Sequence, residues 1–393
     1  MKSAGFINLP DWKNRLQEIL TELGREEMLR FPVLGRENAE SPWVTLDPED
    51  FFSAVQTGIH FAGTNNIRRL PENLITTDAE LAISRLLKGK FRQTFFSAAI
   101  GSTFPFQHII CSKYVVSRPE KFIVLNDSVV GFILSKMEKE SKNLEQAIHE
   151  AQWEKLVGGN PSLNLHGMVT RNRLILQIAH IFGRIIRPES IKAVGINNLA
   201  IEDVRIATEL GFSIRLLGMA QYRSDVLQAI VEPCMIPEKY LLAQARGGSE
   251  MIYVKTLDGS SQVYSCPGTS PEMQISGILS DLFDTSRDFS ENIQLHEKVE
   301  SFSDSFYLRF NIVNITDTLA RLLELFNRSN IEIEKIYQPV AGVSRETSNS
   351  AGQTVVLVTG KTTRDNLEKN LAMVSKHVKL AGLKALFRFI RQA

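Results

Sequence analysis

The C-terminal quarter of the chain alternates between strand-type and helix-type segments in an order that few folds accommodate. The strand-type runs are SFYLRFNIV from residue 305, IEIEKIYQPV from 331, TVVLVTG from 354 and LKALFRFI from 383. Segments with helical periodicity, DTLARLLELFNRSN and RDNLEKNLAMVSKHV, follow the first and the third of these runs. The resulting β-α-β-β-α-β order is that of the ferredoxin-like split βαβ unit. We therefore predict a separate domain over residues 301–393, after a polar linker that ends near residue 300.

The stretch before this unit also mixes both types of element. KFIVLNDSVVGFILSKMEK begins with a β-rich run and continues with helical periodicity, and a long helix is predicted over 168–184. The runs IKAVGI, FSIRLLGMA, MIYVKTL and SQVYSC have β character, with IEDVRIATELG as a helix between the first two. This alternation indicates an α/β (α+β) body over residues 75–300. Before it, an amphipathic helix is predicted over 11–30, within a proline-interrupted segment over 1–74.

Composition excludes several classes of protein. Lys+Arg 45 against Asp+Glu 44 gives a net charge of +1, so the chain lacks the basic field of a nucleic-acid-binding protein. No apolar run reaches the roughly 18 residues of a membrane span, and the N-terminus lacks the apolar core of a signal peptide. Three scattered cysteines and seven histidines include no pair at metal-ligand spacing. We expect a soluble cytoplasmic protein with no metal, no nucleic-acid partner and no membrane partner.

The sequence lacks the common motifs for nucleotide binding and catalysis. A dinucleotide-binding turn needs G-x-G-x-x-G so that the backbone can approach the pyrophosphate, and no two of the 24 glycines are separated by a single residue. The patterns G-x-x-x-x-G-K-[ST], G-x-S-x-G and H-E-x-x-H are missing as well. We therefore predict no complete Rossmann domain, and the residues taken alone show no converging acid, base or nucleophile.

Several segments of the central body nevertheless match the pattern of one enzyme family. GINNLAIEDVRIATELGFSIRLLG, from Gly195, is similar to G-I-x-x-I-x-x-x-D-I-x-x-A-x-x-L-G-x-x-I-K-L-L-G, with Arg215 in place of the lysine. SCPGTSPEMQISGILSDL is similar to G-P-G-A-G-x-x-P-T-A-S-A-V-x-x-D-L. On these segments the chain resembles homoserine dehydrogenases over most of residues 75–282. The resemblance implies a family of NAD(P)-dependent oxidoreductases in threonine and methionine biosynthesis, with residues 1–74 as a reduced remnant of the nucleotide-binding domain or a docking element.

The charged site positions that the resemblance implies carry other residues in this chain. The lysine of the family's T-A-N-K corresponds to Ala79, and N-G-T-T-N corresponds to a run that contains Asp127 and Ser128. The family's E-x-D-P-x-x-D-x-x-G-x-D-x-x-x-K supplies carboxylates and a lysine. The matching positions here hold Gly158, Asn160, Asn164, Val169 and Arg173.

These replacements remove the groups that the family's reaction needs. Oxidation of homoserine requires a group that manages the hydroxyl proton, usually an ammonium with a tunable pKa. Ala79 has no such group, and Arg173 keeps its proton at any physiological pH. We therefore predict that no family catalytic residue is intact, that no cofactor is bound, and that the protein is a non-catalytic relative. If the family fold is kept, the polar residues expected to line the former active-site cleft are Asp127, Ser128, Asn164, His166 and Arg173.

The C-terminal unit resembles the ACT domain that many of these enzymes carry. Family members usually have D-x-P-G-x-L between the first strand and helix, and the run here is Asn314-Ile315-Thr316-Asp317-Thr318-Leu319. Capping of the helix is the simpler explanation of Asn314 or Thr316. Gln338 matches the glutamine of the family's I-x-I-x-x-V-x-Q. The effector-site candidates are Asn314, Asp317, Thr318 and Gln338.

Three functions remain open at this point. The first is a non-catalytic subunit that regulates, senses a small ligand or acts as a scaffold, and the second is a working homoserine dehydrogenase that binds NADP or NAD. The third is a different enzyme that uses the polar lining of the old cleft. The resemblance implies a homodimer or tetramer, because the family's sheet pairs across a two-fold axis and ACT domains often associate side by side. An amino acid effector and a protein partner are further candidate ligands.

Overall fold

The computed structural model describes residues 118–157, 160–266, 293–312, 315–339, 353–377 and 381–390, with short pieces of the first 117 residues. Among these pieces, β1 (Leu29–Pro32) pairs with β2 (Trp43–Leu46), β3 (His60–Gly63) with β4 (Asn66–Arg69), and β5 (Ile75–Thr76) with β6 (Phe95–Phe96). The helix predicted over 11–30 lies outside the described residues except at its end. There the prediction is wrong, because Leu29 and Arg30 pair with β2 as part of an extended strand.

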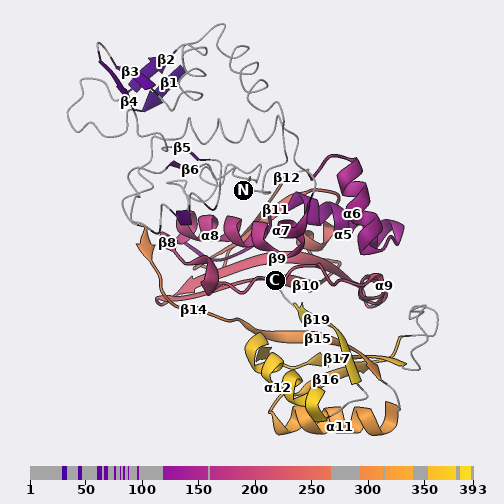
Figure 1. The fold of residues 1–393 in the computed structure, drawn as a ribbon. Coiled ribbons are helices and arrows are strands. Elements are labelled where there is room, and N and C mark those ends of the chain that lie inside the picture. Colours follow the sequence, from indigo (N-terminus) through magenta and orange to yellow (C-terminus); the bar gives the residue numbers. More distant parts are fainter. Residues whose placement is uncertain are drawn as a thin grey trace.

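One sheet of eleven strands runs through the central and C-terminal parts of the chain (Figure 1). Its order is β12-β11-β7-β9-β10-β19-β15-β17-β16, with β14 beside β10 and β18 beside β15. The central strands are β7 (Pro119–Leu125), β9 (Phe212–Arg223), β10 (Val226–Pro237), β11 (Glu250–Thr256) and β12 (Ser261–Cys266). They pair antiparallel, and β9 and β10 form a hairpin that is matched over its whole length.

Helices cover one face of this central sheet. They are α5 (Ser128–Glu140), α6 (Leu144–Trp153), α7 (Ser162–Leu165) and α8 (Met168–Phe182), and α9 (Ile201–Glu209) leads into β9. The long helix predicted over 168–184 is confirmed as α8, which starts after Gly167 and ends at Gly183, both with positive φ. Ile175 and Ile178 of α8 are completely buried in the same core as Phe122 of β7. None of the helices in the described part of the chain is long and apolar enough to span a membrane.

The C-terminal unit has the predicted order of elements. It runs β15 (Ser303–Ile312), α11 (Ile315–Arg328), β16 (Ile333–Tyr337), β17 (Gln353–Thr359), α12 (Arg364–His377) and β19 (Ala381–Phe389), with the short β18 (Thr362–Thr363) before α12. Its strands lie in the order β19-β15-β17-β16. Alternation along β15 divides its side chains, because Phe306, Leu308 and Phe310 share a core with α11 and α12 whereas Tyr307 joins the core of the central body.

Two expectations about the segments between these elements are corrected. The run IKAVGI does not form a strand. Its one β-type contact is an isolated bridge between Ala193 and Val231 of β10. The linker is not a free polar segment where the structure describes it. Its strands β13 (Gln294–Leu295) and β14 (Val299–Glu300) pair with β8 (Arg184–Ile185) and with β10, so their backbone hydrogen bonds fix the segment to the central body.

The C-terminal strand joins the two parts of the sheet. β19 lies between β15, to which it is antiparallel, and β10, to which it is parallel through Cys234 and Met235. Beside this junction, Glu232 of β10 is 2% exposed and accepts hydrogen bonds from both Arg364 and Arg388. Arg388 also donates to Asp304 at the start of β15. Buried charges are retained only when they are paired, so these pairs tie the two parts together.

A second buried cluster joins α9 to β15. Arg309 donates from Nε to Asp203 at 2.7 Å and from Nη1 to Glu202, and Tyr307 donates to Asp203 at 3.2 Å. Burial raises the pKa of the Asp203 carboxyl, and the hydrogen bonds from Arg309 and Tyr307 oppose that rise. Glu202 and Asp203 both lie in the first turn of α9, where the helix dipole favours negative charge. Arg309 of the C-terminal unit is thus neutralised by two carboxylates of the central body, at the contact between β15 and α9.

We predict that Arg388→Met lowers the free energy of unfolding by about 3 kcal/mol, because the buried carboxylate of Glu232 then loses one of its two arginine partners. Urea unfolding measures the change. The control is Arg328→Met, in which an exposed ion pair with Glu324 is removed and less than about 0.5 kcal/mol is expected. Equal losses in the two variants would contradict the structural role of the buried cluster.

Candidate functional site

The candidate site begins where β7 ends and α5 starts. Asp127 stands at the N-cap of α5, in an extended conformation, and its Oδ1 accepts a hydrogen bond from the backbone N–H of Val130 at 3.2 Å. An Asp at this position satisfies one of the free N–H groups of the first turn and places its negative charge at the positive end of the helix. The side chain is 8% exposed. Its second partner comes from a distant part of the chain.

Asn164 of α7 supplies that partner. Its Nδ2 lies 3.0 Å from each of the two carboxylate oxygens of Asp127, and the side chain is 4% exposed. The negative charge of Asp127 fixes which end of the amide faces it, because the amide oxygen would be repelled. Asp127 is therefore held by a neutral donor and by a helix N-terminus.

Arg173 of α8 reaches the same region from the other side. Its Nη1 donates to the backbone oxygen of Asn126 and lies 3.5 Å from Oε1 of Glu250, at the start of β11. The side chain of Asn126 donates to Oε1 of Gln177 at 3.4 Å. Arg173 is 9% exposed and Glu250 is 1% exposed, so this ion pair is shielded from water.

Two acceptor atoms in this cluster remain without a hydrogen bond. They are Oδ1 of Asn126 and Oδ1 of Asn164, both buried, and neither has a partner within the part of the chain that the structure describes. Buried polar atoms nearly always find a protein or water partner. Each oxygen therefore has room in its hydrogen-bonding capacity for a water or for a donor group of a ligand.

The structure brings some of the predicted cleft residues together and separates others. Asp127, Asn164 and Arg173 lie in one buried cluster, with Ser128 beside Asp127 at the start of α5. His166 does not join them. It is exposed, and its Nδ1 lies 2.8 Å from the backbone oxygen of Ser162 and 3.3 Å from its hydroxyl, within the same turn of chain.

The remaining family positions add no charged group. Val169 is 6% exposed and belongs to the apolar interior. Ala79 and Gly158 lie outside the described residues. Asn160 is exposed, and its Oδ1 accepts from the backbone N–H of Ser162 at 2.9 Å, in a local turn just before α7.

Sequence reasoning missed Asn126, Gln177 and Glu250. Asn126 directly precedes the run matched to N-G-T-T-N, which begins at Asp127, so its position was a usable signal. Gln177 and Glu250 lie 51 and 77 residues from their partners in the cluster. Only the fold brings them there, because α8 packs across β7 and β11 lies next to β7.

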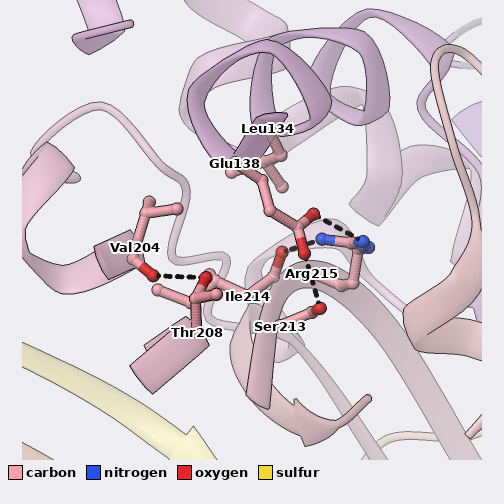
Figure 2. A pocket seen from close by; sticks show the side chains of 7 residues that line it. All are labelled: Leu134, Glu138, Val204, Thr208, Ser213, Ile214 and Arg215. Atoms are coloured by element: carbon pink, nitrogen blue, oxygen red, sulfur yellow. Dashed lines mark hydrogen bonds and ion pairs between the residues drawn. The ribbon is translucent and has the colours of Figure 1, made fainter. Parts of the chain in front are cut away.

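A second polar cluster lies near the C-terminal end of α5 (Figure 2). Glu138 accepts from Nη2 of Arg215 at 2.9 Å and from the hydroxyl of Ser213 at 2.7 Å. Arg215 is 3% exposed, and burial lowers the pKa of its guanidinium, while the charge of Glu138 acts in the opposite direction. Figure 2 shows Glu138 reaching from the helix to the strand that carries Ser213 and Arg215.

The effector-site candidates are spread over the start of α11 and the end of β16. Asp317 is exposed and pairs with Arg321 at 3.2 Å, one turn along the same helix. Thr318 is 1% exposed, and Gln338 is exposed just after β16. Asn314 lies outside the described residues.

The central body is similar in sequence to proteins of one known family. The family model described as homoserine dehydrogenase matches residues 121–283, which contain Asp127, Asn164, Arg173 and Glu250. The homoserine dehydrogenase of Bacillus subtilis is 21% identical over 260 residues, which cover 63% of this chain and 60% of that protein. That of Methanocaldococcus jannaschii is 29% identical over 159 residues, covering 40% and 46%. The central body of the chain, over residues 121–283, thus matches the homoserine dehydrogenase family.

Solved structures of homoserine dehydrogenases share its fold. The enzyme from Thiobacillus denitrificans aligns with a TM-score of 0.71 at 22% identity, over 81% of this chain and 76% of that one. The Staphylococcus aureus enzyme gives 0.60 at 18% identity, over 89% and 80%. The alignments with the first curated homoserine dehydrogenases span about 60% of their length. The mixed α/β fold with a large sheet is thus confirmed as that of the family.

We predict that Asn164→Asp lowers the free energy of unfolding by about 2 kcal/mol or more at pH 7, because two buried carboxylates would then face each other. The pair would raise one folded-state pKa above the unfolded value of about 3.9, so the folded state binds the extra proton. The loss is present above the raised pKa and shrinks as the pH falls toward about 4. Urea unfolding at several pH values measures it.

Asn160→Asp is the matched control for this prediction. It makes the same chemical change at another family position, but the side chain is exposed, and an aspartate accepts the local hydrogen bond from the backbone N–H of Ser162 as well as an asparagine does. Its stability is expected to stay within about 0.5 kcal/mol of the parent. A pH-independent loss in Asn164→Asp, or an equal loss in both variants, would show that Asn164 and Asp127 do not form the described pair.

Proposed function

We propose that this member of the homoserine dehydrogenase family does not transfer hydride and instead serves as a regulatory, ligand-sensing or scaffold subunit. The observation that carries the proposal is the mutual pairing of the polar groups at the end of β7. Asp127 is engaged by Asn164 and by the start of α5, and Arg173 is engaged by Asn126 and Glu250.

The proposal follows from what these groups can do to a proton. A general base or acid needs a pKa near the working pH and a free path to the reacting atom. The guanidinium of Arg173 stays protonated, and the amide of Asn164 does not titrate. Val169 supplies no charge. Among the described residues of the cluster, the carboxylates are Asp127 and Glu250, and both are held in pairs.

The nicotinamide cofactor that the family implies does not fit the described residues at this site. The hollow beside Asp127 has a cavity volume of about 10 Å³, about enough for one water molecule. Gly247 and Ser249 close it against the start of α5. The sequence also lacks the glycine turn that brings a backbone to a pyrophosphate. We therefore derive no reaction step through NADP or NAD.

The C-terminal unit supplies the regulatory half of the proposal. Its β-α-β-β-α-β order and sheet order support an ACT-like domain, with a small amino acid as effector and a dimer or tetramer as the assembled form. Asn314, Asp317, Thr318 and Gln338 would form the effector site.

The second candidate is a working NAD(P)-dependent homoserine dehydrogenase of threonine and methionine biosynthesis. The names of the relatives favour it, since the matched curated proteins are called homoserine dehydrogenases. It requires that residues 1–74 or a partner chain bind the cofactor without the glycine turn, and that new residues manage the hydroxyl proton.

We predict no homoserine-dependent reduction of NADP or NAD by the purified full chain at high protein concentration. The Bacillus subtilis homoserine dehydrogenase in the same buffer is the positive control. Turnover that saturates with homoserine, is lost in Arg173→Met and persists in Arg223→Met, at an exposed surface position, would contradict the proposal in favour of the second candidate.

The ligand-sensing role makes a separate prediction. Threonine or methionine is expected to raise the midpoint of thermal unfolding of the full chain, because a ligand that binds only the folded state stabilises it. Gln338→Ala should abolish this shift, whereas Glu324→Ala, at an exposed position of α11, should preserve it. A shift that survives in Gln338→Ala would place the effector elsewhere, and the absence of any shift would remove these two effectors.

A further inference from the structure

We propose that Glu138 and Arg215 form a clamp that holds a short loop over the hollow beside Asp127, so that this loop is a gate to the candidate site. The loop consists of residues 245–249, between the turn η3 (Leu241–Gln244) and β11. The inference concerns access to the hollow and does not depend on whether the site is catalytic.

The loop forms one wall of the hollow. Asp127, Gly131 and Leu134 line the hollow from the side of the helix, and Ala245, Gly247 and Ser249 line it from the side of the loop. A cavity volume of about 10 Å³ admits little more than one water. A larger group can therefore occupy this hollow beside Asp127 only if the loop moves.

The loop lies between η3 and β11, outside the strands of the sheet. Hydrogen bonds that involve side chains hold it in place. Nη2 of Arg215 donates to the backbone oxygens of Ala243 at 2.6 Å and Ala245 at 3.3 Å. The backbone N–H of Gly247 donates to the hydroxyl of Ser135 at 2.9 Å. Arg215 thus anchors the start of the loop, and α5 anchors its middle.

Glu138 sets the position of Arg215. Its Oε2 accepts from the same Nη2 that reaches the loop, and its Oε1 accepts from the hydroxyl of Ser213 (Figure 2). The side chains of Arg215 and Glu138 are 4% and 12% exposed, so the pair is shielded and well oriented. Arg246, at the start of the loop, adds a second cation 3.5 Å from Glu138. Loss of the carboxylate charge would loosen Arg215 and Arg246 together.

The backbone of the loop is suited to movement and packs closely when shut. Gly247 has φ +58°, a conformation that favours glycine, and Gly248 follows it. A Cβ added to Gly131 of α5 would lie 3.1 Å from the backbone oxygen of Gly247. The closed position thus depends on the absence of a side chain at Gly131.

Hydrogen–deuterium exchange of the full chain tests the clamp. In Glu138→Gln, amide exchange in residues 245–249 should accelerate by about tenfold or more, as expected when a hydrogen bond to a charged group is lost. Exchange in β15 and β17 should not change. The matched control is Glu140→Gln, on the same helix, which removes a carboxylate from an exposed network with Lys136 and Lys142 and should leave the loop unchanged.

Gly131→Ala tests the same loop without touching the clamp. Alanine favours the helix over glycine, so this variant does not weaken α5, but its methyl group presses on Gly247. The same acceleration in residues 245–249 is expected. Unchanged loop exchange in both Glu138→Gln and Gly131→Ala would overturn the proposal, as would a uniform rise across the whole protein in both, which would show a general loss of stability.

Discussion

The architecture depends on a buried carboxylate in the middle of a sheet. Glu232 lies in β10 with almost no exposure, and its charge is compensated by Arg364 and Arg388, which both come from the C-terminal unit. A carboxylate in such a place is tolerated only with partners, since its transfer from water is costly. The buried charge of Glu232 is therefore compensated only when the C-terminal unit is in position, with β19 beside β10. The second cluster, in which Arg309 meets Glu202 and Asp203, applies the same constraint to α9.

The same principle governs the candidate site. A cluster that brings together an aspartate, an arginine and a glutamate is the kind of arrangement from which catalysts are made. Here each charged group is paired: Asp127 with an amide and a helix N-terminus, and Arg173 with Glu250 and a backbone oxygen. The unpaired side-chain atoms of the cluster, within the described residues, are the amide oxygens of Asn126 and Asn164. Such a site can bind a donor group, whereas proton transfer would first require that a pair be broken.

Much of the fold could be predicted from the sequence, because local patterns determine the elements. In β15 the apolar side chains of Phe306, Leu308 and Phe310 alternate with others, and α8 begins and ends at glycines that have positive φ. What the sequence did not predict was the burial of Arg309 and Arg388 within strands, each paired with a carboxylate of the central body. Those carboxylates, Asp203 and Glu232, lie more than 100 residues away in the chain, so no local signal connects them. For the site, the resemblance located Asp127, Asn164 and Arg173, but only the packing of α8 and β11 added Gln177 and Glu250. His166 was placed wrongly with them, because its local bond to Ser162 directs it back into its own turn.

The central proposal is that this chain keeps the fold of the homoserine dehydrogenases without their dinucleotide chemistry. Calorimetric titration of the purified full chain with NADP, and separately with NAD, tests it most directly. The Bacillus subtilis enzyme under identical conditions serves as the reference. The account predicts no saturable heat of binding for this chain with either nucleotide. A saturable isotherm near one nucleotide per chain would contradict it.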